Sequence, residues 1–104
     1  MNKIKLNNLD LKTFTEQDAE DYCSINNLNY NNIIQLSLSF NKLTDISGIK
    51  LFKNIKKLYL HCNELTDIFD LKDLINLKEL YLWGNQIKDI SVLKDLKKLE
   101  ILYI

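Results

Sequence analysis

The chain has 104 residues, which is enough for one domain and too few for two. Its hydrophobic fraction of 46% is typical of a globular protein and excludes an intrinsically disordered one. Basic and acidic residues balance at 14 each, and every basic residue is Lys. This argues against nucleic-acid binding, because proteins of that class concentrate positive charge and favour Arg.

Neither membrane insertion nor secretion is indicated. No apolar run approaches the roughly 18 residues that a membrane span needs. The start, MNKIKLNNLDL, lacks the continuous apolar segment of a secretory signal. Cys23 and Cys62 are too few for a disulfide framework and lack the spacing of a metal site. We therefore expect a cytoplasmic protein with free thiols, no cofactor and no bound metal.

Residues 1–32 are predicted to form an N-terminal cap. The stretch FTEQDAEDYCSINN has the pattern of a short helix over about residues 15–26, with Thr15 as its N-cap and Asn26 and Asn27 at its end. Apolar side chains that precede this helix are expected to cover the open core of the first repeat. They are Ile4, Leu6, Leu9, Leu11 and Phe14.

A sequence repeat begins at residue 33 and continues without insertion. Its copies, all of equal length, are 33–54, 55–76 and 77–98, followed by a partial copy at 99–104. The first half of each copy contains LxL or a close variant, whose period of two is typical of a strand that places its leucines in a core. The second half has apolar residues at a period of three, which indicates a 3₁₀ helix.

Two polar residues recur with the same period. An Asn follows each predicted strand (Asn41 and its two copies), and its side chain can bond backbone groups of its own turn and of the next turn. An Asp precedes each predicted 3₁₀ helix (Asp45 and its two copies), where a carboxylate can cap free amide groups. Both are therefore predicted to be structural.

The repeat LxxLxLxxNxLxDIxxLxxLxN resembles the leucine-rich repeat family in its bacterial form, which has this same repeat length and is like the repeats of internalins. The match covers residues 33–104. The resemblance implies an α/β fold: a right-handed solenoid with a parallel sheet on its concave side, 3₁₀ or other short turns on its convex side, and a helical cap. It also implies a binding protein without chemistry of its own.

Residues between the inward leucines face outward on the predicted concave sheet. Aromatic residues align there in two neighbouring columns, one of tyrosines and one of His and Trp. Tyr and Trp dominate binding hot spots, because they present large rigid surfaces with a polar group. We therefore predict a face that binds a protein or peptide, made of Lys57, Tyr59, His61, Glu79, Tyr81, Trp83 and Tyr103. In the first repeat the outward positions hold Gln35, Ser37 and Ser39.

Two other interpretations of the aromatic columns remain open. Stacked aromatic residues stabilise neighbouring strands by packing alone, so the columns could be purely structural. Aromatic faces also stack on sugar rings, which would make this a carbohydrate-binding module. Only Glu79 and Gln35 would then supply the polar groups that such a site needs.

The C-terminal segment, LEILYI, ends within a predicted strand, and an unpaired strand edge tends to associate. Leu93 and Leu96 are expected to be exposed beside it. Two copies could pair as a homodimer that buries Leu99, Leu102, Tyr103 and Ile104. Alternatively, the last two residues fold over the end, or the sequence is cut short there.

Catalysis is not indicated. His61 and Cys62 are adjacent in a predicted strand, so their side chains point to opposite sides. Ser39 could approach His61, but no acidic residue clearly orients the imidazole. One His and two separated Cys do not supply the three ligands of a metal site. The sequence thus predicts a protein that is not an enzyme.

Overall fold

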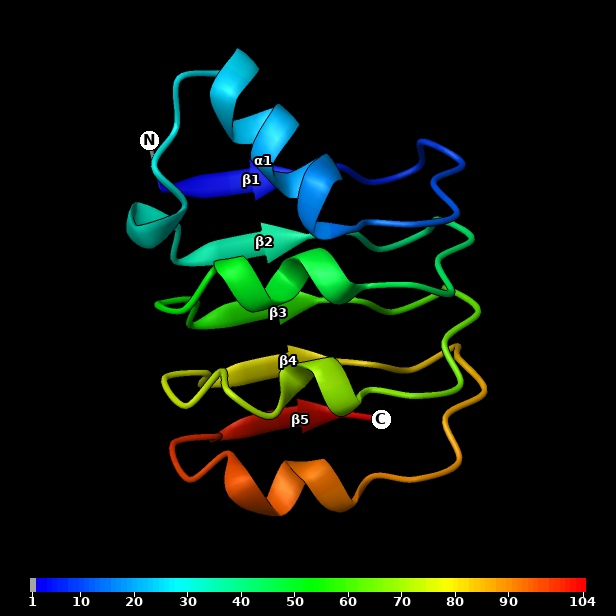
Figure 1. Cartoon of the computed structure of the whole chain (residues 1–104). Helices are drawn as coiled ribbons and strands as arrows, with labels where there is room; N and C mark the ends of the chain where they lie inside the picture. The colour runs from blue at the N-terminus through cyan, green and yellow to red at the C-terminus, as the bar shows by residue number, and fades with distance from the viewer. Residues whose placement is uncertain (1) are drawn as a thin grey trace.

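The computed structural model describes residues 2–104. Within this range, five short strands form one parallel sheet in chain order. They are β1 (Lys3–Lys5), β2 (Gln35–Ser37), β3 (Lys57–Tyr59), β4 (Glu79–Tyr81) and β5 (Ile101–Tyr103). Figure 1 shows the strands stacked one above another, with the N-terminus beside β1 and the C-terminus beside β5.

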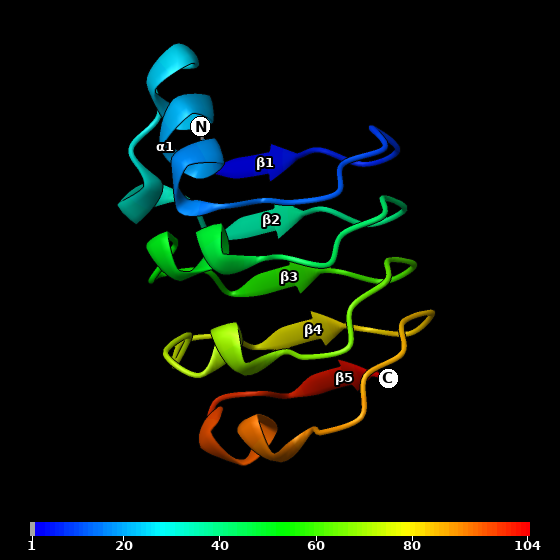
Figure 2. The same cartoon turned by 45° about the vertical axis from the view of Figure 1, so that its right-hand side comes forward.

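The opposite side of the solenoid carries the helices (Figures 1 and 2). The helix α1 spans Glu16–Ile25. The 3₁₀ helices are Tyr30–Asn32, Ser47–Leu51, Phe69–Leu71 and Ser91–Asp95. None of the helices in the described part is long and apolar enough to span a membrane.

The core is built from equivalent residues of successive repeats. Leu36 pairs in register with Leu58, and Leu58 with Leu80, because the copies have equal length. These three leucines have no exposed surface, and neither do Ile49 and Phe52 from the other half of the first repeat. The predicted core pattern, in which strand leucines meet apolar residues from the 3₁₀ half, is therefore confirmed.

The recurring Asn joins successive turns by hydrogen bonds. Asn63 donates from Nδ2 to the carbonyl oxygens of Leu60, at 3.0 Å, and Leu38, at 3.1 Å. Its Oδ1 accepts from the Leu43 amide at 3.0 Å. Leu38 and Leu43 belong to the preceding repeat, whereas the repeat pattern predicts bonds to the following one. The bonds run toward the preceding repeat because the buried Leu43 amide needs an acceptor, and the Asn63 Oδ1 supplies it.

The recurring Asp caps the 3₁₀ half, as predicted. Asp45, Asp67 and Asp89 each accept a hydrogen bond from the amide two residues ahead, at 2.9, 2.6 and 2.8 Å. These bonds stabilise the ionised carboxylate and so hold the pKa of Asp45 and Asp89 below its usual value. The three residues are therefore structural.

The helix α1 begins with a capping box. Thr15 accepts from the Asp18 amide at 3.2 Å, and the Asp18 carboxylate accepts from the Thr15 amide at 2.9 Å. Asn26 is the C-cap. Ala19 and Cys23 are buried, so this side of the helix packs on the solenoid core.

Residues before α1 form an additional coil that was not predicted. Ile4 in β1 pairs with Leu36 in β2, and both are buried. Leu9, expected in the core, is 54% exposed. It aligns with Asn41 of the next coil, at the position of the repeated Asn, and its amide donates to the Asn41 Oδ1 at 2.9 Å. The backbone thus turns there, and its side chain points away from the core.

The last coil is more open than the others. Leu96 was expected to be exposed but is buried, because it packs within the core cluster just after the last 3₁₀ helix. Leu93 and Leu99 are half-buried, and Leu102 is 40% exposed. The apolar end is therefore only partly covered in the described chain.

Candidate functional site: the concave face

The sheet face that points away from the 3₁₀ helices is termed the concave face. Its residues stay in register beyond the strands, because the Phe40 amide donates to the His61 carbonyl at 3.1 Å and the Cys62 amide to the Trp83 carbonyl at 2.8 Å. His61 and Trp83 therefore lie opposite each other in the same register as the paired strands. All seven residues predicted from sequence lie on this face.

The tyrosine row is a stack of parallel rings. The centroids of Tyr59 and Tyr81 are 4.6 Å apart with an interplanar angle of 7°, and those of Tyr81 and Tyr103 are 5.2 Å apart at 10°. This spacing follows from the distance of about 4.8 Å between neighbouring strands. Because the rings stack, ring faces between neighbours are covered, and free faces remain only at the two ends of the row.

A second row runs beside the first. His61 and Trp83 stack with centroids 4.6 Å apart at 20°. Phe40 meets His61 edge-on, with a centroid distance of 5.2 Å. Trp83 is 43% exposed and Phe40 is 47% exposed, so the row contributes apolar surface to solvent.

Two charged residues stand beside the tyrosines. Lys57 and Glu79 form an ion pair at 3.4 Å, and the Tyr81 hydroxyl donates to the Glu79 Oε1 at 2.9 Å. This hydrogen bond raises the pKa of Tyr81 to about 12, with smaller contributions from burial and from the charge of Glu79. The hydrogen bond and the ring on each face hold the phenol in one orientation.

His61 is not arranged for catalysis. Its Nδ1 is buried and has no hydrogen-bond partner within residues 2–104, so no carboxylate orients the ring through that nitrogen. Burial lowers the pKa of His61, which leaves the imidazole neutral at physiological pH. No cluster of three or more metal-ligating side chains occurs in the described part of the chain.

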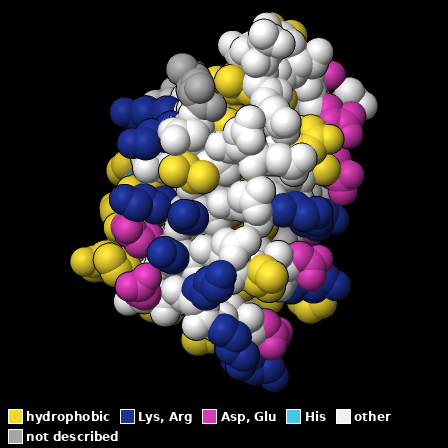
Figure 3. Space-filling model, turned by 90° about the vertical axis from the view of Figure 1, so that its left-hand side faces the viewer, with side chains coloured by type: hydrophobic (Ala, Val, Ile, Leu, Met, Phe, Trp, Pro, Cys, Tyr) yellow, Lys and Arg dark blue, Asp and Glu magenta, His cyan; other side chains and the backbone are white. Residues whose placement is uncertain are grey.

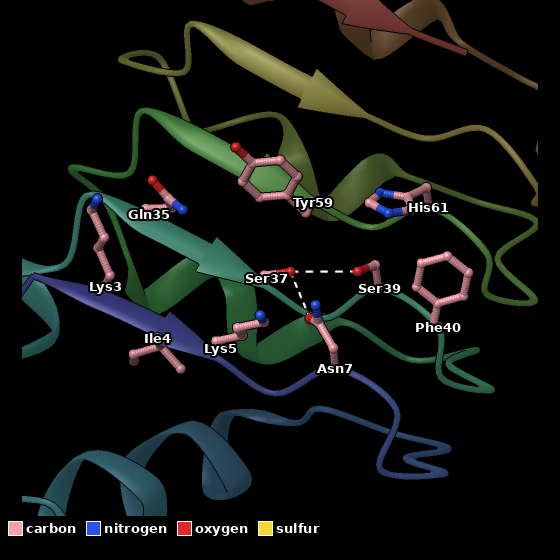
Figure 4. A pocket seen from close by; sticks show the side chains of 10 residues that line it. All are labelled: Lys3, Ile4, Lys5, Asn7, Gln35, Ser37, Ser39, Phe40, Tyr59 and His61. Carbon is pink, nitrogen blue, oxygen red and sulfur yellow. Dashed lines mark hydrogen bonds between the residues drawn. The ribbon is translucent and has the colours of Figure 1, made fainter.

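A hollow of about 410 Å³ lies at the N-terminal end of both rows. Figure 4 shows its floor at Ser37 in β2 and at Ser39 just after this strand, between Lys5 and Asn7 on one side and Tyr59 on the other. The Ser37 hydroxyl donates to the Asn7 Oδ1 at 2.6 Å. Ser37 and Ser39 lie on the concave face as predicted but are 8% and 1% exposed, because the larger residues on both sides enclose them.

The family model described as Leucine Rich repeats (2 copies) matches residues 31–73 and 75–104. The chain belongs to the leucine-rich repeat family. Proteins of this family generally mediate protein–protein interaction and are typically not enzymes. No curated protein matches this leucine-rich repeat chain.

Solved structures of bacterial proteins are similar to it. An internalin of Listeria monocytogenes has a TM-score of 0.68 and 31% identity, over 71% of this chain and 22% of its own. Internalin C2 of the same organism has a TM-score of 0.67 and 33% identity, over 69% of this chain and 32% of its own. A leucine-rich repeat protein of Leptospira interrogans has a TM-score of 0.75 and 26% identity, over 97% of this chain and 25% of its own.

These comparisons confirm the internalin-like repeat type and the fold of the leucine-rich repeat protein. The chain spans between 22% and 32% of the length of the three proteins.

Sequence reasoning missed the residues that β1 contributes to the concave face. Lys3 stands opposite Gln35, and Lys5 opposite Ser37. The signal was the alignment of KIKLNN, at 3–8, with QLSLSF, at 35–40, in which apolar residues coincide. A search at the repeat period passes over it, because α1 lengthens the first coil of the leucine-rich repeat protein.

The predicted dimer edge lies at the other end of the sheet. Leu99 is half-buried, whereas Tyr103 is 54% and Ile104 is 59% exposed. Within residues 2–104, β5 pairs with β4 and with no other strand. This end therefore presents both apolar side chains and backbone groups without a strand partner.

Proposed function

We propose that this leucine-rich repeat protein is a non-catalytic interaction module that binds a protein or peptide through its concave face. The contact residues are Lys57, Tyr59, His61, Glu79, Tyr81, Trp83 and Tyr103. The observation that carries the proposal is the pair of adjacent aromatic rows, which is exposed at Trp83, Phe40 and Tyr103.

The physical argument is one of preorganisation. Immobilising an interface side chain on binding costs conformational entropy. This cost is smaller when the side chain is already held in one orientation before binding. Tyr81 is held by a ring on each face and by its hydrogen bond to Glu79. The rows therefore offer rigid apolar surface to a partner, and Lys57 and Glu79 supply polar groups that orient it.

The stacking geometry favours a peptide over a sugar. A sugar ring packs on the face of an aromatic ring. Within the tyrosine row these faces are covered by the neighbouring rings and only the outer faces of Tyr59 and Tyr103 are free, so a ligand that lies along the row meets mainly ring edges. Ring edges suit aliphatic and aromatic side chains of a polypeptide, which pack from any direction.

The test uses a Tyr81→Ala/Trp83→Ala double variant. The parent and the variant are immobilised, and partners are captured from cells of the source organism and identified by mass spectrometry. A partner held by the parent should be lost. Phe69→Ala, which removes a 63% exposed aromatic residue from the other side of the solenoid, is the matched control and should retain it. Capture of the same partners by the double variant would refute the proposal.

Self-association through β5 is a second candidate. It is favoured by the exposure of Leu102, Tyr103 and Ile104 beside an edge with no strand partner in the described range. Pairing of two such edges would satisfy backbone groups and bury the apolar side chains. Sedimentation equilibrium should then give a dimer for the parent and a monomer for Leu102→Glu, whereas a monomeric parent at high micromolar concentration would exclude this candidate.

A further inference from the structure

We propose that the hollow between β1 and β3 binds an acidic side chain of the partner peptide. This inference rests on the proposed function, because it specifies the partner chemistry for one end of the same face. The occupant is a polypeptide segment whose Asp or Glu carboxylate enters the hollow while neighbouring side chains contact the aromatic rows.

The shape of the hollow follows from a change of residue size along each row. Tyr59 stacks on Tyr81 with one face, and its other face looks toward Ser37, which is too small to cover it. Next to it, Ser39 occupies the position that His61 and Trp83 fill in later repeats. The two serines therefore leave space for one or two ligand side chains, bounded by an aromatic ring.

The polar lining of the hollow suits a carboxylate. Lys3 and Lys5 supply two cationic groups, and Asn7 and Gln35 supply amide groups (Figure 4). The Ser37 hydroxyl already donates to the Asn7 Oδ1, so the Asn7 amide nitrogen is the donor that this pair offers to a ligand. None of the ten lining residues is acidic. A carboxylate accepts hydrogen bonds from all of these donors, and charge-assisted bonds are the stronger kind.

The lysines of the hollow are not neutralised by the protein itself. Ion pairs within residues 2–104 involve Lys42, Lys50 and Lys57, and neither Lys3 nor Lys5. Both side chains are exposed. Their positive charge is therefore available to a ligand.

More positive charge lies along the side of the solenoid where the strands begin. Lys56, Lys78 and Lys98 line a second hollow there, are exposed and take part in none of these ion pairs. Figure 3 shows Lys side chains gathered on this side, with acidic side chains mainly toward its edges. Because the chain has no net charge, this is an uneven distribution of charge rather than a generally basic protein. Such a field attracts an acidic partner and orients its approach.

The test is an NMR titration at low ionic strength with two probes of matched shape. They are N-acetyl-glutamate N-methylamide and its neutral counterpart, N-acetyl-glutamine N-methylamide. The glutamate probe should shift the amide signals of Lys5, Ser37 and Tyr59 in a saturable manner, and the glutamine probe should not. Salt should weaken the effect, because the two lysines are exposed.

Two variants locate the site. Lys3→Gln/Lys5→Gln should weaken binding of the glutamate probe by roughly tenfold, as expected for the loss of two exposed ion pairs. Lys12→Gln/Lys88→Gln removes the same charge outside the hollow and should leave the affinity within about twofold. Equal weakening by both pairs would mean that net charge alone attracts the probe and would overturn the inference.

A third variant fills the space instead of removing charge. Ser37→Tyr extends the tyrosine row by one ring and should abolish the shifts while Lys3 and Lys5 remain. Retained binding in this variant, or equal shifts with both probes in the parent, would also overturn the inference. Neither result would affect the proposed function, which is tested separately at Tyr81 and Trp83.

Discussion

The Tyr59 ring lies parallel to the Tyr81 ring, with centroids 4.6 Å apart and an angle of 7° between their planes. Parallel strands in direct register place equivalent side chains at this distance, so a repeated Tyr becomes a continuous stack. The same relationship stabilises the fold and leaves ring edges exposed to a partner.

We predict that Tyr59→Ala lowers the free energy of unfolding by about 1–2 kcal/mol, because it removes one stacked pair and buried aromatic surface. Tyr103→Ala removes the same side chain from the 54% exposed end of the row and should cost less. Urea unfolding followed by circular dichroism measures both changes. Each residue makes one stacked pair with Tyr81, so equal losses would indicate that the deeper burial of Tyr59 contributes little.

Asn63→Ala should be among the most destabilising substitutions at a polar position. It leaves the buried amide of Leu43 without its acceptor and the Leu38 carbonyl without one donor, at an expected cost of about 3 kcal/mol. Asn54→Ala, at an exposed residue that donates only to the Asn31 carbonyl, should cost less than about 1 kcal/mol. Chemical denaturation measures the free energy of unfolding of both variants. Similar losses for the two would contradict the conclusion that the recurring Asn stabilises the turns.

Gly48→Ala should disrupt the docking of α1. A Cβ at this position would meet the backbone carbonyls of Phe14 and Thr15, which are held by their own hydrogen bonds. We expect a loss of about 2–3 kcal/mol, typical of overpacking against groups that cannot move aside. Asp70 occupies the equivalent position of the next repeat. In thermal unfolding, Asp70→Ala should therefore lower the melting temperature much less than Gly48→Ala does.

Stability should fall on mild acidification because of His61. Burial holds its pKa in the folded state below the unfolded value of 6.5. The unfolded state then binds the proton more readily, so the stability contributed by the neutral imidazole is fully present above pH 6.5 and is lost as the pH falls through the folded pKa.

The measurement compares unfolding free energies at about pH 7.5 and about pH 5.5, where carboxyl groups contribute little. His61→Phe preserves an aromatic ring between Phe40 and Trp83 and should remove this pH dependence. Asp45 and Asp89 also stabilise the fold less as the pH falls. Their effect is confined to a lower pH range, because it is lost only below pH 3.8, as the pH falls through their lowered pKa values. An unchanged pH dependence in His61→Phe would assign the effect to another group.

The sequence by itself determined the repeating unit. Apolar spacing placed Leu36, Leu58 and Leu80 in one core column, and the recurring Asn and Asp identified the residues that satisfy the turns. These features follow from local requirements: a strand has a side-chain period of two, and buried backbone groups need partners. Because every copy must meet the same requirements, the pattern can be recognised from the sequence alone. The outward position of Tyr59, Tyr81 and Trp83 follows from the same alternation.

Only the tertiary structure decided how the ends of the solenoid are built. β1 joins the sheet through pairing of Lys3–Lys5 with Gln35–Ser37, and the inserted α1 makes this interval longer than the repeat, which hides the pairing from a search at the repeat period. That pairing brings the two lysines beside the small serines and creates the hollow. It also turns Leu9 outward, while packing within the last coil buries Leu96. These outcomes depend on contacts between distant segments and on relative side-chain size, neither of which a local periodicity specifies.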